Sequence, residues 1–131
     1  MDLLPTLLAA SGIELPDDVA FDGLNLGPLL RNPSGKLDRE ALYFHYPHYY
    51  STTTPVSAVR TRDWKLLEYY EDNRAELFHL KKDLGETTDL AKQYPERTAQ
   101  LRSQLQRWRG EVGAQEPEPN PDFKTRKSDI R

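Results

Sequence analysis

The sequence predicts an α+β fold, in which a small four-stranded antiparallel sheet is packed by a C-terminal helix. Short runs of aromatic and β-branched residues lie between residues 41 and 80 and are typical of strands. After Pro95, apolar residues recur at intervals of three and four, which indicates a helix with one apolar stripe. Ahead of the strands we expect a short helix followed by an ordered strap, because residues 2–12 are rich in leucine and residues 13–35 are rich in Pro, Gly, Asp and Asn.

The composition limits the kind of protein this can be. With 131 residues the chain fits one small domain with a modest core. A net charge of −3 with interspersed signs disfavours nucleic acid, and no stretch reaches the roughly 20 apolar residues of a membrane span. The absence of cysteine excludes disulfides and thiolate sites. We therefore expect neither a nucleic-acid nor a membrane partner, and Asp2 argues against a signal peptide.

The first predicted helix covers residues 3–11. Asp2 is a suitable N-cap, Pro5 lies in the first turn, and Gly12 lies where a left-handed residue ends a helix. The apolar side chains surround most of this helix, so it requires neighbours on several sides. The strap that follows carries spaced leucines and a short helical turn near 28–31.

Four strands are predicted at 41–46, 55–61, 64–70 and 75–80. The connections between the last three are short enough for hairpins, so the strands should form an antiparallel meander. We expect one face of the sheet to be covered and the other to be wet.

A short helical segment is predicted to start at 87–89, and a longer helix at Pro95. Gly110 and Gly113 should end the longer helix, and its apolar stripe should pack on the sheet. The stripe consists of Tyr94, Thr98, Leu101, Leu105, Trp108 and Val112. The predicted organisation is therefore the helix and strap at 1–35, a subdomain at 36–113, and a disordered or surface-draped tail at 114–131, which is rich in proline and charge.

Two blocks of sequence resemble the sulfatase family of the alkaline phosphatase superfamily. The first, 2–12, is similar to the D-x-x-P-T-x-x-x-x-x-G helix near the end of the sulfatase core domain, and 21–30 continue it. The second, 58–91, is similar to the sulfatase ending, with A-V-R-x-x-x-W-K-L-L followed by an acidic turn. Leu84 stands where proline is usual and Asp89 where asparagine is usual, but both residues suit turns or caps.

The resemblance implies a parent enzyme that hydrolyses sulfate esters. Sulfatases make a formylglycine nucleophile within a C/S-x-P-S/T-R motif, which has no counterpart in this sequence. The calcium-binding carboxylates likewise belong to the N-terminal part of such enzymes. We therefore expect a fragment without catalytic or metal-binding residues, inactive alone, that walls the substrate cleft beside an N-terminal sulfatase domain. The expected substrate is a sulfated small molecule or glycan, and family habit points to a periplasmic or secreted parent.

The resemblance also implies candidate substrate-binding residues. In sulfatases the loop after the first C-terminal strand reaches over the active-site mouth, where this sequence places His45, His48, Tyr49 and Tyr50. Imidazole and tyrosine offer hydrogen bonds together with a flat apolar face. The alternative is a strand end that packs its aromatic side chains against the sheet. A metal site is disfavoured, since residues three apart in a strand point to opposite faces.

Other residues have plainer interpretations, and other functions stay open. We expect Arg60 to be an exposed charge or to pair with an acid of the N-terminal domain, and Trp64, Trp108 and His79 to be structural. One functional alternative is a phosphonate or phosphodiester hydrolase of the same superfamily. Another is a non-catalytic glycan-binding module. We also predict self-association through residues 2–12, because the leucine helix lacks its neighbours.

Overall fold

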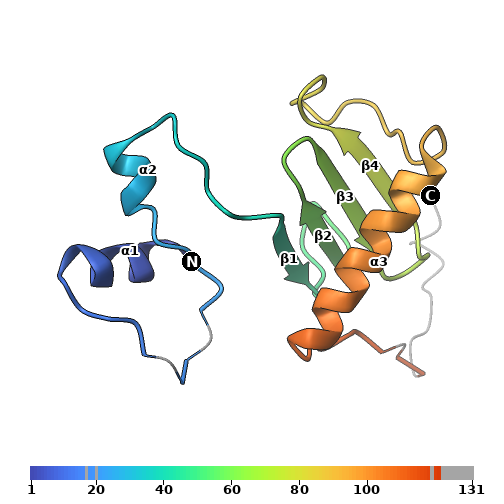
Figure 1. Ribbon diagram of the computed structural model, residues 1–131. Helices are drawn as coiled ribbons and strands as arrows, with labels where there is room; N and C mark the ends of the chain where they lie inside the picture. Colours follow the sequence, from blue (N-terminus) through green and yellow to red (C-terminus); the bar gives the residue numbers. More distant parts are fainter. Residues whose placement is uncertain (17, 20, 119, 122–131) are drawn as a thin grey trace. The chain divides into compact units, whose positions relative to one another are not determined.

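The structure, a computed structural model, describes residues 1–16, 18, 19, 21–118, 120 and 121. The chain divides into two compact units, Met1–Arg39 and Glu40–Arg131. Figure 1 shows two short helices in the first unit, and four strands followed by a long helix in the second. Among the described residues, no helix combines the length and apolar content that crossing a membrane requires.

The first unit contains helices α1 (Leu3–Ala10) and α2 (Gly27–Arg31), close to the predicted ranges. Gly12 has a φ of +70° and follows the last turn of α1, which confirms the expected left-handed position. Of the eight residues of α1, only Pro5 is buried. The leucines of this helix are therefore left largely in contact with solvent.

Asp2 does not cap α1 as predicted, because its side chain makes no hydrogen bond to the helix. Its carboxylate instead accepts the Leu24 amide at 3.0 Å and both terminal nitrogens of Arg39. Thr6 completes the link: its Oγ1 donates to the Asp2 carbonyl at 2.6 Å and accepts from the Leu26 amide at 2.9 Å. The polar residues of the D-x-x-P-T segment therefore fasten the strap to the helix.

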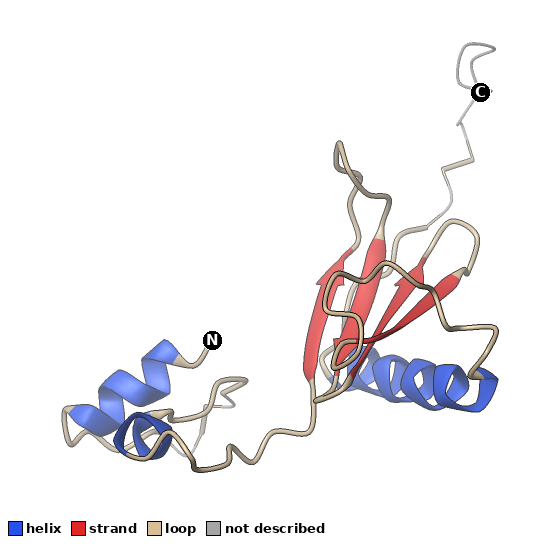
Figure 2. Cartoon of the chain, turned by 90° about the horizontal axis from the view of Figure 1, so that it is seen from above, coloured by secondary structure: helices blue, strands red, loops and turns tan. Residues whose placement is uncertain are grey.

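The second unit contains a sheet of four antiparallel strands in the order β1-β2-β3-β4, which confirms the predicted meander. The strands are β1 (Leu42–Tyr46), β2 (Val56–Arg60), β3 (Trp64–Tyr69) and β4 (Ala75–His79). Helix α3 (Pro95–Glu111) lies along one face of the sheet, as the two views show (Figures 1 and 2). The second unit thus has the predicted α+β fold.

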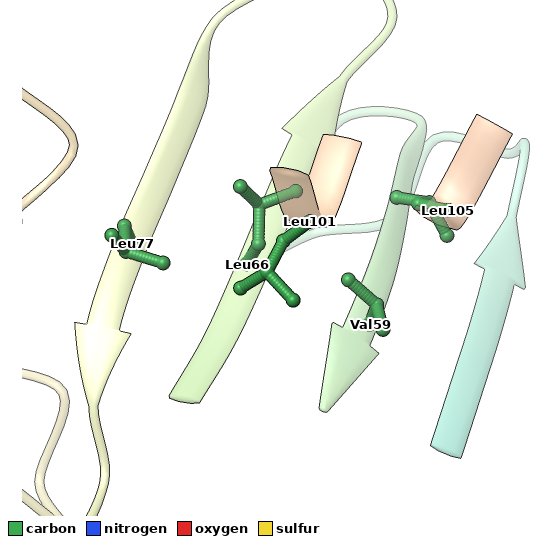
Figure 3. Close-up of a cluster of buried hydrophobic side chains, with 5 residues drawn as sticks. All are labelled: Val59, Leu66, Leu77, Leu101 and Leu105. Atoms are coloured by element: carbon green, nitrogen blue, oxygen red, sulfur yellow. The ribbon is translucent and has the colours of Figure 1, made fainter. Parts of the chain in front are cut away.

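The core lies between the sheet and α3 and consists of aliphatic side chains (Figure 3). Trp108 borders the core and stacks on Tyr43, with ring centroids 4.9 Å apart. Trp64 also packs against the core and lies 4.4 Å from the ring of His79, as expected for structural residues. The fully buried members are Val59, Leu66, Leu77, Leu101 and Leu105.

The helical segment predicted at 87–89 is absent, because side chains and β4 use the backbone amides there. The Asp83 carboxylate accepts from the Thr87 and Thr88 amides at 2.8 and 2.9 Å. The Leu90 amide donates to the Leu77 carbonyl at 2.8 Å. The segment therefore lies beside β4 without forming a helix.

The face of the sheet opposite α3 was predicted to be wet, and it is exposed to solvent only in part. Strand alternation places on it residues that are mostly apolar, and Ala58 and Phe78 among them are only 6% exposed. Phe44, in register with Ala58, is 52% exposed. The sheet thus carries apolar side chains on both faces.

The end of the chain returns to the sheet where the structure describes it. The Glu116 carboxylate lies 3.2 Å from Arg109 Nε, so this part of the tail is held on the surface. The rest of the predicted tail, 119 and 122–131, lies outside the described residues. The boundary predicted after residue 35 lies within the first unit, since Arg39 is tied to Asp2.

Candidate functional site

The predicted substrate-binding residues lie at and beyond the end of β1, an edge strand of the sheet. Pro47 follows the strand directly, and it cannot donate to a strand ladder. The chain then turns back on itself, since the backbones of Tyr50 and Thr53 exchange hydrogen bonds at 3.0 and 3.3 Å. The loop therefore has a defined shape that presents its side chains outward.

Tyr49 and Tyr50 are 70% and 65% exposed. The Tyr49 hydroxyl donates to Glu71 Oε1 at 2.6 Å, and this hydrogen bond to a carboxylate raises the pKa of Tyr49 above its usual value. Tyr49 therefore stays protonated and is oriented by the turn between β3 and β4. Tyr50 keeps its ring free among the described residues for a ligand to stack on.

A surface hollow of about 510 Å³ opens beside Tyr49. It lies at the end of the sheet where the β1–β2 loop and the β3–β4 turn meet the returning tail. Its walls combine rings with carboxylates, and they include Tyr49, Pro55, Tyr70, Glu71, Pro117 and Glu118.

His45 takes part in a polar cluster on the α3 side of the sheet. Its Nδ1 lies 2.8 Å from Ser57 Oγ and 3.1 Å from the Tyr70 hydroxyl, and those two oxygens are 2.8 Å apart. Its Nε2 lies 2.8 Å from the Gln115 carbonyl, which can only accept. His45 is therefore protonated at Nε2, and its Nδ1 accepts a hydrogen bond when the ring is neutral.

Arg109 and Glu68 extend this cluster beneath the loop. Arg109 Nη1 donates to the Tyr70 hydroxyl at 3.1 Å. The same nitrogen lies 3.2 Å from Glu68 Oε2 and forms an ion pair with it, but this contact lacks the geometry of a hydrogen bond. Arg102 donates to the other Glu68 oxygen at 2.8 and 3.0 Å. Arg109 is only 8% exposed, so the pair is held away from most of the solvent. The cluster supports the strand from which the exposed residues project.

The structure brings together some of the predicted site residues and separates others. His48 packs its ring edge-on against Tyr46, with centroids 5.5 Å apart, on the face opposite α3. His45 lies on the α3 side, so the two imidazoles do not converge. Within the described part of the chain, no group of three or more His, Cys, Asp or Glu could hold a metal ion.

The cluster partners of His45 were not anticipated from the sequence. Arg109 continues the series Leu101, Leu105 at a spacing of four, and this signal could have placed it on the buried side of α3. Ser57 alternates with Val59 and so faces the same side of β2. Glu68 pairs with Arg102 of the helix, and Arg60 is exposed.

Comparison with known proteins decides the family. The family model described as N-sulphoglucosamine sulphohydrolase, C-terminal, matches residues 1–111. The chain belongs to the sulfatase family, as a C-terminal domain. This confirms the resemblance read from the sequence, and the match covers the first unit and the second unit as far as the end of α3.

Individual sulfatases match along much of this chain. It is 39% identical over 93 residues to the Delta 4,5-hexuronate-2-O-sulfatase of Bacteroides thetaiotaomicron, which covers 70% of this chain and 19% of that protein. A solved 2-O GAG sulfatase superimposes with a TM-score of 0.73 at 31% identity, covering 92% of this chain and 27% of that one. The chain thus spans 19% and 27% of the lengths of these two relatives.

One further solved structure contains a bound sugar. That protein, in complex with its substrate D-glucosamine-2-N,6-O-disulfate, superimposes with a TM-score of 0.69 at 27% identity. The match covers 88% of this chain and 24% of the other.

Proposed function

We propose that this chain is the C-terminal subdomain of an enzyme that hydrolyses sulfate esters, and that it forms one wall of the substrate cleft. The observation that carries this proposal is the exposed aromatic loop after β1 in a chain of the sulfatase family. The remaining four fifths of such an enzyme would carry the reaction centre, since this chain matches only 19% of its hexuronate-sulfatase relative.

The residues present in this chain indicate which part of the reaction it can support. Formylglycine and calcium supply the nucleophile and the positive charge in sulfatases, and this chain does not fit either of them. It has no cysteine and no C/S-x-P-S/T-R motif, and its described residues offer no metal-ligand cluster. In our proposal both groups belong to the N-terminal part of the parent, and the isolated chain is inactive.

The proposed substrate class is a sulfated sugar. One relative is named for a sulfated hexuronate and another was solved with a disulfated glucosamine. Tyr49 and Tyr50 present exposed rings that suit the apolar face of a sugar, and His48 supplies ring nitrogens for its hydroxyl or sulfate groups. These three residues would contact the part of the substrate next to the reacting ester.

His45 has two possible roles that experiment separates. As a donor to an anionic substrate group, its Nε2–H would have to leave the Gln115 carbonyl. As an anchor, it would keep that contact and hold β1 against Ser57. A donor contributes to KM without affecting folding, whereas an anchor contributes mainly to stability.

A fusion protein tests the proposal. In it, this chain replaces the matching C-terminal segment of the Bacteroides hexuronate sulfatase, and sulfate release from a sulfated unsaturated hexuronate is measured with calcium present. We expect turnover by the fusion, and a rise in KM of about fivefold when His48 or Tyr50 is replaced by alanine, since one good hydrogen bond or stacking contact contributes about 1 kcal/mol.

The matched control is Thr52→Ala. Thr52 is exposed in the same loop, and within the described residues its backbone makes no hydrogen bond to the candidate substrate-binding residues. It should leave both kcat and KM unchanged. Turnover that is insensitive to the replacement of His48 and of Tyr50 would remove the loop from the substrate cleft. His45→Asn adds the remaining distinction: a changed KM at unchanged stability supports the donor role, and lost stability at unchanged KM supports the anchor.

A further inference from the structure

A hollow lined by cations lies at the end of the sheet where β2 turns into β3. Arg60 is the last residue of β2, Arg62 lies in the turn that follows, and Lys81 comes shortly after β4. The hollow thus gathers three positive charges and one negative charge, in a chain whose net charge is −3. Its volume is about 520 Å³, and its walls are formed by Arg60, Arg62, Asp63, Leu80, Lys81 and Leu84.

The three cationic side chains of this hollow are available to a ligand. Arg60, Arg62 and Lys81 are exposed, and none of them makes a side-chain hydrogen bond or ion pair within the described residues. Asp63, the acid in the wall, likewise forms no ion pair with them in that part of the chain. Since like charges held at one place repel each other, the hollow favours an anionic ligand.

Hydrogen bonds fix the backbone that carries these cations. The Leu80 amide donates to the Asp63 carbonyl at 2.8 Å, which joins the end of β4 to the turn between β2 and β3. The Thr61 amide donates to the Trp64 carbonyl, also at 2.8 Å, and closes that turn. A ligand that binds to groups on a fixed backbone has less conformational freedom to remove.

The lining of the hollow fits a sulfated sugar. The guanidinium groups of Arg60 and Arg62 can bind the oxygens of an oxyanion through paired N–H donors, and the Lys81 ammonium adds a point charge. Leu80 is 7% exposed, and Leu84 is 80% exposed. These two leucines offer apolar surface to the C–H groups of a sugar ring beside its sulfate.

The hollow lies at the other end of β2 from the candidate substrate loop. Val56 begins β2 beside that loop, and Arg60 ends the strand at the hollow. Because a strand rises by about 3.3 Å per residue, the two ends of β2 are about 13 Å apart. A single sugar held by the loop is too short to reach the hollow, whereas a longer glycan can extend that far.

We propose that this hollow binds a sulfate group of the glycan substrate at a distance from the ester that is hydrolysed. Arg60, Arg62 and Lys81 hold the sulfate oxygens, and the contact adds affinity for long chains over short ones. The inference rests on the proposed function and extends its substrate class from a sulfated sugar to a glycan that carries sulfate on several units.

Calorimetric titration of the full chain with a sulfated glycosaminoglycan hexasaccharide tests the hollow without any turnover. Binding should be measurable at low salt and should weaken as salt screens the charges. It should fall about tenfold in the triple variant, because each exposed charge contact contributes about two- to threefold. The triple variant combines Arg60→Gln, Arg62→Gln and Lys81→Gln.

The matched control changes the net charge by the same amount at exposed cations outside the hollow. It combines Arg31→Gln, Lys92→Gln and Arg107→Gln, and it should keep the affinity of the unchanged chain. Equal losses in the two triple variants would overturn the proposal, because they would show a general effect of charge. Equal affinity for the desulfated hexasaccharide, or no binding to the unchanged chain, would also overturn it.

The fusion protein tests whether the hollow serves the enzyme. The triple variant of the hollow should raise the KM for a hexasaccharide that ends in the sulfated unsaturated hexuronate by about tenfold. It should leave the KM for the single hexuronate unchanged, since only the longer substrate spans the length of β2. Unchanged KM values for both substrates would contradict the proposal. A fusion without turnover that still binds the hexasaccharide through the three cations would refute the proposed function while sustaining this inference.

Discussion

The Nδ1 atom of His45 lies 2.8 Å from the hydroxyl of Ser57, directly across the β1–β2 pair. Ser57 is 1% exposed, so this contact is shielded from water, and the Tyr70 hydroxyl closes it into a triangle. Satisfied buried polar clusters make a structure rigid and specific. The edge strand that carries the candidate substrate loop is thereby fixed to the middle of the sheet.

Replacing Ser57 with alanine should lower the free energy of unfolding of the isolated chain by about 1 kcal/mol, the usual net contribution of a hydrogen bond. The loss stays modest because Tyr70 and His45 can still bond to each other at 3.1 Å. Urea unfolding followed by tryptophan fluorescence measures it. Ser51→Ala, in the exposed loop, is the control and should have no effect. Equal stability of the two variants would show that the triangle does not support the sheet.

Replacing Leu101 with alanine should destabilise the second unit by about 2–5 kcal/mol, the range for leucine in a tightly packed core. Leu101 is 0% exposed and contacts the sheet from the middle of α3. Leu84→Ala makes the same chemical change at a residue that is 80% exposed, and it should alter stability by less than about 0.5 kcal/mol. Similar losses at both positions would contradict the core described here.

The link between α1 and the strap should depend on pH in the acid range. The pKa of the Asp2 carboxyl is lowered from 3.8 to about 2. The largest cause is the hydrogen bond from Arg39, and the second is the hydrogen bond from the Leu24 amide. A depressed carboxyl pKa means that the stabilisation is fully present above about pH 4 and is lost as the pH falls through about 2. The amide shift of Leu24, followed by NMR, should move over this range. Asp2→Asn should abolish the transition, and a midpoint near 3.8 in the unchanged protein would argue against the ion pair.

The isolated chain should self-associate through residues 2–12. Leu3, Leu4 and Leu7 are 74%, 54% and 62% exposed in α1, an apolar surface that favours association in water. Light scattering should show a mean mass that rises with concentration, and the double substitution Leu3→Glu with Leu7→Glu should reduce that rise. Leu84→Glu serves as the comparison in the second unit. A clean monomer at high concentration would refute this prediction.

Much of the second unit was predictable, because its elements follow local pattern. Every strand begins and ends within about a residue of its prediction, since alternating apolar residues and short polar turns leave few other arrangements. The Leu101 and Leu105 stripe identified α3 in the same way. These features depend on neighbours in the sequence.

The errors occurred where a side chain forms hydrogen bonds that the local pattern did not indicate. Asp2 has the chemistry of a helix cap, yet Arg39 competes for it from 37 residues away. Thr87 and Thr88 could begin a helix, but the Asp83 carboxylate takes their amides. The buried Arg109 also escaped prediction, since only the fold brings it to Glu68 and Tyr70. Within the candidate site, β1 ends before Pro47 as predicted, whereas the surroundings of His45 required the structure.

The most direct test of the account is sulfate release by three proteins measured side by side: the isolated chain, the Bacteroides core without its C-terminal segment, and the fusion of that core with this chain. If the chain forms a wall of the cleft but lacks the reaction centre, only the fusion should release sulfate. Calcium-dependent turnover by the isolated chain, or equal turnover by the core alone and the fusion, would contradict it.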